Sequence, residues 1–294
     1  MDARLSPGAA VLTLLAVASC FASNHLCARI AFDHGASVVA AISARATFTS
    51  LVLLAVMRVK GIRLAIPRGL RGMTLLAGLL IASQSYCLYS AVALIPPALA
   101  LLVFQTFPML YVLLTWALGR ERPRWNALWP MALALVGLSL ALNLRPGHFA
   151  ADWAAIRAGV AWAFASGASM TVAYYLNANA LKPLDGRLRT FAMTAVTAVL
   201  VIIAGAATGT QVFPRAGVGW LGIALLACFY CIGMLSLFFI LPRISTTTTA
   251  ALNFEPIALL VLSWLILDIA VAPVQIVGAL LTVSAIAWLG FAKA

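Results

Sequence analysis

The chain alternates between long apolar segments and short polar connections over its whole length. A helix of roughly 20 apolar residues is about long enough to cross a hydrocarbon layer of ~30 Å. In lipid, only helices and closed barrels satisfy every backbone polar group. The pattern therefore predicts an all-α integral membrane protein with ten transmembrane helices. The expected spans are residues 9–31, 36–57, 72–93, 97–118, 126–143, 156–178, 189–207, 217–240, 246–267 and 271–291.

Lysine and arginine collect in every second connection between these spans. With the amino end on side one, that side carries fourteen of them and the other side carries four. Because basic connections stay cytoplasmic during membrane insertion, we expect both termini to be cytoplasmic. Arg45 is the one basic residue placed well inside a span.

Composition removes several classes of protein. Hydrophobic residues make up 64% of the 294 residues and charged residues only 9%, whereas roughly a quarter of the residues in soluble domains are charged. The net charge of +12 would favour nucleic-acid binding in a soluble protein, but the cytoplasmic connections account for it. We expect the lipid bilayer and a small-molecule substrate as partners, and no nucleic acid. The sequence leaves the oligomeric state open.

The usual signatures of processing and catalysis do not fit this sequence. Val17–Cys20 imitates a lipoprotein signal, but the apolar run continues through Ile30, so we expect no cleavage there. A G-x-x-x-x-G-K-[ST] phosphate loop is lacking. The three histidines and five cysteines do not form a set of zinc ligands. We therefore expect no cofactor, no metal site and no catalytic residues.

Stretches of the first half of the chain resemble stretches of the second half. Gln105–Pro108 (Gln-Thr-Phe-Pro) lies 148 residues before Asn253–Pro256 (Asn-Phe-Glu-Pro), and the same offset relates Trp116 to Trp264. We expect two halves of five spans each, residues 1–147 and 148–294. Since five is odd, the second half starts on the opposite side of the membrane, which predicts two inverted repeats with a substrate site at their interface.

Short motifs follow one another in a recognisable order along both halves. They are Ser23-Asn24, Arg29, Arg45, Tyr89-Ser90-Ala91, Pro108 and Gly119-Arg120-Glu121 in the first half, and Phe254-Glu255-Pro256 and Val274-Gln275 with Gly278 in the second. Together they resemble the EamA-type transporters of the drug/metabolite transporter superfamily over essentially the whole chain. Ile269 departs from the pattern, where the second repeat usually has glutamate, and Pro130 replaces a glycine.

The resemblance implies a ten-helix exporter of metabolites with a central cavity walled by spans from both halves. It allows amino-acid export but does not choose among amino acids. We expect the protein to reside in a bacterial inner membrane.

Glu255 is the only carboxylate placed deep within a predicted span. Ionisable residues inside a membrane are costly and are functional candidates by default. Pro256 follows Glu255 and removes a helix hydrogen bond, as Pro108 does in the matching fourth span. Glu255 takes part in substrate or proton binding, or it pairs with Arg45 or a neighbouring helix. Arg45 in turn binds a carboxylate in a bidentate fork, snorkels toward a bundle end, or anchors two helices.

Polar and aromatic side chains within the spans complete the candidate site. The polar members either line the substrate path or bond helix to helix, and the aromatic members either line it or pack against lipid and neighbours. The predicted substrate-binding residues are Asn24, His25, Tyr86, Tyr89, Gln105, Trp162, Tyr174, Asn253 and Glu255.

These observations predict a secondary transporter that exports small metabolites by alternating access, with amino acids as the expected substrates. The aromatic candidates favour large neutral or aromatic side chains. The alternatives are an integral-membrane transferase acting on lipid-linked substrates, and a lipid-moving or scaffolding protein. Because the acidic and histidine residues do not cluster at a membrane face, we expect no enzyme.

Overall fold

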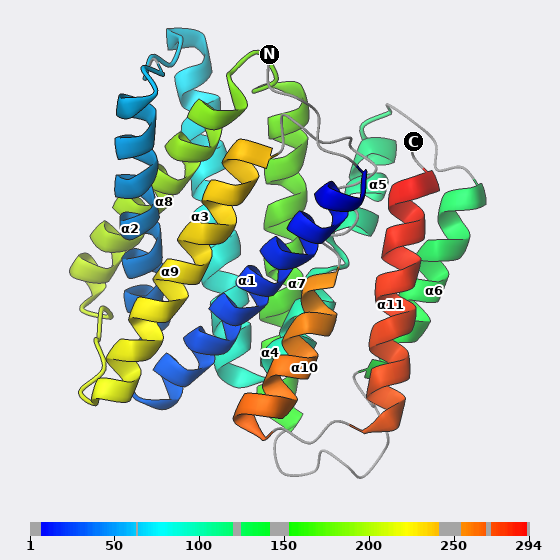
Figure 1. The fold of residues 1–294 in the computed structure, drawn as a ribbon. Helices are drawn as coiled ribbons and strands as arrows, with labels where there is room; N and C mark the ends of the chain where they lie inside the picture. The colour runs from blue at the N-terminus through cyan, green and yellow to red at the C-terminus, as the bar shows by residue number, and fades with distance from the viewer. Residues whose placement is uncertain are drawn as a thin grey trace.

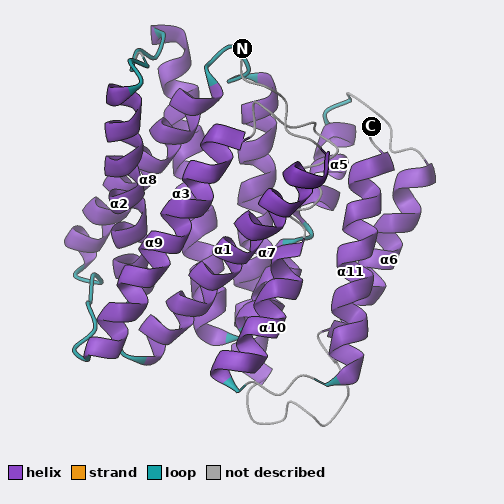
Figure 2. Cartoon of the chain, viewed as in Figure 1, coloured by secondary structure: helices purple, strands orange, loops and turns teal. Residues whose placement is uncertain are grey.

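A computed structural model describes residues 7–62, 64–119, 125–141, 153–240, 254–268 and 272–292, and the regular elements within these ranges are all α-helices (Figure 2). They are α1 (Pro7–Asp33), α2 (Val38–Val59), α3 (Arg68–Leu94), α4 (Pro97–Phe104), α5 (Phe107–Ala117), α6 (Trp125–Ala141), α7 (Trp153–Asn179), α8 (Gly186–Thr208), α9 (Gly217–Ile240), α10 (Glu255–Leu267) and α11 (Pro273–Ala292).

Each of the ten expected spans contains helix, and the fourth contains two helices, α4 and α5. The expectation of an all-helical membrane protein is confirmed. Within the described residues, six segments are long and apolar enough to cross a membrane, and three further apolar helices are shorter. The six are Leu12–Asp33, Val38–Val59, Arg68–Leu94, Pro97–Ala117, Gly186–Thr208 and Gly217–Phe239; the three are Trp129–Ala141, Glu255–Leu267 and Pro273–Ala285.

Local sequence explains where several helices begin and end. Ser37 caps α2, its side chain accepting a hydrogen bond from the Ala40 amide. Asp185 caps α8 in the same way through the Arg187 and Leu188 amides. Such caps satisfy amides that have no partner within the helix. Gly209 ends α8 with a φ of 66°, a left-handed conformation that glycine adopts at no steric cost.

Most of the helices form a closed ring (Figure 1). Around the ring α1 packs on α9, α9 on α2, α2 on α8, α8 on α3 and α3 on α7. The ring continues from α7 to α4 and α5, from α4 to α10, and from α10 back to α1. α6 and α11 pack closely on each other beside the ring, which they touch through α4 and α10. α1 begins and α11 ends at the same end of the bundle (Figure 1).

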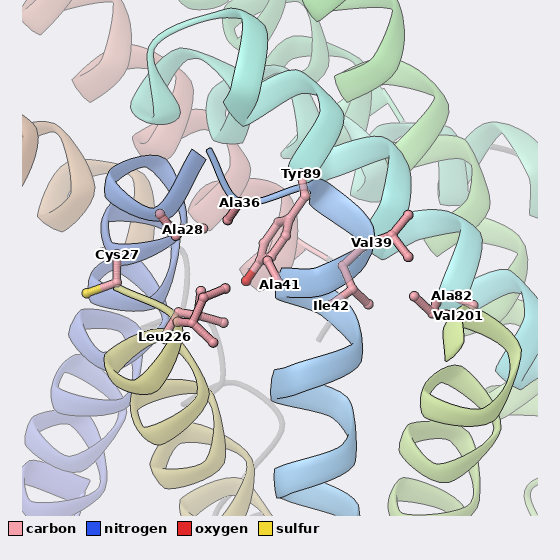
Figure 3. Packing of buried hydrophobic residues seen from close by; sticks show 12 residues of the cluster. Cys27, Ala28, Ala36, Val39, Ala41, Ile42, Ala82, Tyr89, Val201 and Leu226 are labelled. Carbon is pink, nitrogen blue, oxygen red and sulfur yellow. The ribbon is translucent and has the colours of Figure 1, made fainter. Parts of the chain in front are cut away.

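One packed region joins α1, α2, α3, α8 and α9 on one side of the ring. Small residues such as Ala28, Ala41 and Ala82 let these helices approach closely, which is how helices associate in lipid. Figure 3 shows Tyr89 of α3 reaching between α1 and α2, with its hydroxyl pointing toward Leu226 of α9. This region places the polar residues of the candidate site.

Candidate functional site

A buried hydrogen-bond chain joins three helices at Tyr89. Its hydroxyl donates to Asn24 Oδ1 of α1 at 2.8 Å, and Asn24 Nδ2 donates to the Leu226 carbonyl of α9 at 2.8 Å. Tyr89 and Asn24 are both fully buried. Buried polar groups need partners of this kind. These two hydrogen bonds therefore hold α3 and α9 against α1. Sequence reasoning selected Asn24 and Tyr89, and the structure brings them together.

His25 of α1 and Glu255 of α10 contact each other through their polar atoms. The His25 Nε2 to Glu255 Oε1 distance is 3.3 Å, and the two side chains are 7% and 18% exposed. The His25 ring meets the Tyr89 ring edge to face, with 5.6 Å between centroids. In the described part of the chain, the buried His25 Nδ1 has no hydrogen-bond partner. The His25–Glu255 pair therefore lies beside the Tyr89–Asn24 hydrogen bond, and His25 Nδ1 has no partner among the described residues.

Glu255 stands at the first position of α10, a helix of only 13 residues. A helix of this length spans about 20 Å, and α10 occupies only part of the height of the bundle, beginning near its middle (Figure 1). The helix N-terminus carries a partial positive charge that stabilises a carboxylate there. The proline motif of the sequence thus creates a helix start, with Pro256 in its first turn.

Arg45 of α2 lies between two tyrosine rings. Its guanidinium carbon is 4.4 Å from the centre of the Tyr89 ring and 4.2 Å from the centre of the Tyr230 ring of α9. Only 5% of Arg45 is exposed, so the snorkelling alternative is wrong. The alternative pairing of Glu255 with Arg45 is also wrong, since Glu255 pairs with His25.

The fourth span breaks at Gln105 and Thr106, between α4 and α5. Pro108, in the first turn of α5, has no amide hydrogen to continue the ladder. The break packs against α7, where Thr171 Oγ1 donates to the Phe107 carbonyl at 3.1 Å. Gln105 is buried at this break, while its repeat partner Asn253 lies outside the described residues.

The remaining aromatic candidates lie away from the Tyr89 chain. Tyr86 and Trp162 join α3 to α7 with ring centroids 5.8 Å apart, and they are 42% and 38% exposed. Tyr174 stacks at a tilt on Phe107, with centroids 5.4 Å apart, and lies within electrostatic range of Glu255. Tyr86 and Tyr89, three residues apart in α3, thus differ sharply in burial.

Sequence reasoning missed Tyr230 and its role beside Arg45. Tyr230 lies inside a strongly apolar helix between Cys228 and Cys231, where an aromatic residue is usually a packing or lipid-facing residue. The signal that would have selected it is the buried arginine of another span, which needs aromatic or acidic neighbours. Only the packing of α2 on α9 shows which residue meets Arg45.

The geometry defines an all-helical membrane protein with a charged and polar cluster buried among its helices. The model of the EamA-like transporter family matches residues 8–143. These residues, fewer than half of the 294, are thus similar to the EamA-like transporters of the drug/metabolite transporter superfamily. Together with the apolar helices, the match makes this a multi-pass membrane protein. The family is one of membrane transporters and does not favour the transferase alternative.

Comparison with solved structures supports the fold alone. Among 27 matching chains, one described as a crystal structure of a protein covers 96% of this chain and 96% of its own length, with a TM-score of 0.66 and 20% sequence identity. No curated protein matches the chain.

Proposed function

We propose that this protein is a secondary transporter that exports small metabolites by alternating access. The proposed substrates are amino acids, chiefly those with large neutral or aromatic side chains. The observation that carries the proposal is the contact between the buried His25 of α1 and the partly buried Glu255 of α10. A carboxylate and an imidazole inside a membrane are expensive to maintain and are typical of substrate or proton pathways.

We further propose that the chain consists of ten spans in two inverted repeats. The helix packing supports this, because it is nearly unchanged when each helix of one half is exchanged for its counterpart in the other. α1 on α9 corresponds to α7 on α3, and α3 on α8 corresponds to α9 on α2. The pairs α2 with α8, α4 with α10 and α6 with α11 join a helix to its own counterpart, as expected for elements beside a two-fold axis.

Two hydrogen bonds repeat with the same symmetry. Asn24 Nδ2 donates to the Leu226 carbonyl, and Ser166 Oγ donates to the Gln84 carbonyl. Residue 166 follows residue 24 by 142 positions, and residue 226 follows residue 84 by the same 142 positions. Each bond ties the first helix of one half to the third helix of the other. A related pair of buried bonds is hard to explain unless the two halves share one fold.

The helix breaks suggest where the halves move. α5 and α10 each begin with a proline in the first turn, 148 residues apart at Phe107 and Glu255. Broken helices at matching positions of two repeats are the best pointer to a transport site. In this proposal α10 and the α4–α5 break shift against α1 and α7. The His25–Glu255 contact then forms on one side of the cycle and opens on the other.

Orientation follows from the charges. The first turn of α1 and the last turn of α11 lie at one end of the bundle (Figure 1). Arg58, Lys60 and Lys182 belong to connections expected at that end, and few basic residues to connections at the other. We therefore place both termini in the cytoplasm of a bacterial cell, with the protein in its inner membrane.

Flux measurements on purified protein test the function. Proteoliposomes loaded with the protein should take up radiolabelled phenylalanine or another large neutral amino acid well above empty liposomes. The Glu255→Gln and His25→Gln variants, matched by the exposed Arg157→Gln as a control, should lose most of that flux while Arg157→Gln retains it. Folded wild-type protein that moves no amino acid of a full panel would remove amino acids from the proposal.

A further inference from the structure

Within the described residues, Arg45 is a buried cation that contacts two tyrosine rings but has neither a hydrogen bond nor a salt bridge. Arg29, by contrast, is paired with Asp33 and donates to the carbonyls of Val92 and Ala93. Aromatic rings stabilise a buried guanidinium, but the N–H groups of Arg45 still lack acceptors among the described residues, which is unfavourable. A ligand that brings acceptor oxygens to these N–H groups would satisfy them.

The acidic residues that the structure describes do not supply that acceptor. The sequence contains seven aspartates and glutamates. Three of them, Asp2, Glu121 and Asp152, lie outside the described residues. The four described ones are placed elsewhere: Asp33 pairs with Arg29, Asp185 caps α8, Glu255 pairs with His25, and Asp268 lies exposed at the end of α10.

The two tyrosine rings define how a ligand can approach Arg45. The ring centres lie 4.4 Å and 4.2 Å from the guanidinium carbon, so the two rings occupy part of the space around the guanidinium. The N–H groups along the edge of the guanidinium remain, and Arg45 keeps a small exposed surface. An edge of parallel N–H donors fits a planar carboxylate through two hydrogen bonds. A phosphate with two charges would need a second cation, and the neighbouring His25 is already matched with Glu255.

We propose that Arg45, Tyr89 and Tyr230 form the binding site for the carboxylate of the transported molecule. The guanidinium holds the carboxylate, and the two rings keep the guanidinium in position. Asn24 is held by Tyr89 and Leu226 at the same place. The proposal rests on the proposed function as a transporter and deepens it: the substrates are small organic acids or zwitterions, and amines lacking a carboxylate are excluded.

The unpartnered His25 Nδ1 is a second, independent pointer to a ligand. It is buried and belongs to a ring that touches Tyr89. Glu255 lies on the far nitrogen of the same ring. A zwitterionic amino acid with its carboxylate on Arg45 would bring its ammonium group toward the His25–Glu255 side of the cluster. The carboxylate of the ligand would then face Arg45, and its ammonium group would face Glu255.

A comparison of acid and amide ligands tests the assignment. Binding of phenylalanine and of phenylalaninamide to purified protein is measured by calorimetry for the wild type, Arg45→Gln, Arg45→Lys and the control Arg157→Gln. We expect the wild type and Arg157→Gln to bind the acid roughly 10- to 100-fold more tightly than the amide, from the usual strength of charged hydrogen bonds. Arg45→Gln should reduce this ratio to about one by the same argument.

The lysine variant guards against a folding defect. Lysine keeps the charge but loses the bidentate fork, so Arg45→Lys should fold like the wild type and show an intermediate ratio. An acid-to-amide ratio that stays high in both Arg45 variants would overturn the carboxylate site and leave the transporter proposal standing. Wild-type protein that transports amines as well as acids would do the same. Failure of the wild type to bind or transport any amino acid would instead overturn the substrate class, and this site with it.

A chloride titration tests whether Arg45 binds inorganic anions instead. Sodium chloride is titrated without an organic ligand. The melting temperatures of the wild type and of Arg45→Gln should then change with chloride concentration by the same amount. A chloride-dependent stabilisation that is lost in Arg45→Gln, together with equal binding of acid and amide, would make this an inorganic anion site and overturn the proposal.

Discussion

At the scale of single residues, the His25–Glu255 pair concentrates the chemistry of the molecule. It brings an imidazole of α1 against a carboxylate at the start of α10. The contact between these two side chains lies where α10 packs on α1.

The first prediction concerns Glu255. Glutamine keeps the size of the side chain and its polar oxygen, but it cannot exchange a proton. Glu255→Gln should therefore fold normally, and the flux that remains should depend less on pH than that of the wild type. Initial uptake rates in proteoliposomes measure this. An unaltered pH profile in the variant would give Glu255 a structural role.

A second prediction concerns the aromatic rings between α3 and α7. Tyr86 and Trp162 contact each other edge to face and keep exposed surface. If they contact the substrate, Trp162→Ala or Tyr86→Ala should weaken transport of phenylalanine and leucine roughly two- to tenfold more than that of alanine or threonine, from the strength of aromatic contacts. Equal losses across the panel would show that the rings only pack α3 against α7.

At the scale of helices, α6 and α11 depend on glycine for their close packing. A Cβ on Gly137 would lie 2.6 Å from the Thr282 backbone nitrogen, and one on Gly278 would meet the backbone of Gly137 and Ala141. Thr282 Oγ1 also donates to the Ala134 carbonyl at 3.4 Å. Small residues that let backbones touch are the main means of helix association in lipid.

The third prediction follows from this packing. Gly278→Val should separate α6 from α11 and lower the stability of the protein by about 1–3 kcal/mol, the usual cost of overpacking. Thermal unfolding of the purified protein in detergent measures the change. Gly72→Ala is the matched control, because a Cβ there meets no atom within 4 Å. Similar losses in both variants would contradict the role given to the α6–α11 contact.

At the scale of the whole molecule, the proposed inverted repeats predict the topology. The fourth prediction is that reporter fusions after residue 65 and after residue 294 report a cytoplasmic location, whereas one after residue 148 reports an external one. The reason is that five crossings separate the amino end from residue 148, and basic residues hold the other connections inside. A cytoplasmic signal at residue 148 would contradict two inverted halves of five spans.

The sequence predicts the helices well because each predicted span is one continuous apolar run of residues. The break at Gln105 was also readable, since Pro108 removes a backbone donor. The partners within the site were not readable. His25 meets Glu255, and Arg45 meets Tyr230, across contacts between helices far apart in the chain, and a single sequence carries no signal for which faces of two helices meet. Burial had the same limit: Tyr86 and Tyr89 lie three residues apart but have very different neighbours.

The central claim is that the protein carries a small metabolite by alternating access, and counterflow tests it most directly. Proteoliposomes are preloaded with unlabelled phenylalanine and diluted into a trace of the labelled compound. A carrier with one site that faces the two sides in turn should accumulate label transiently above equilibrium, and Glu255→Gln should abolish the overshoot. Label that only equilibrates in the wild type, without any overshoot, would contradict alternating access.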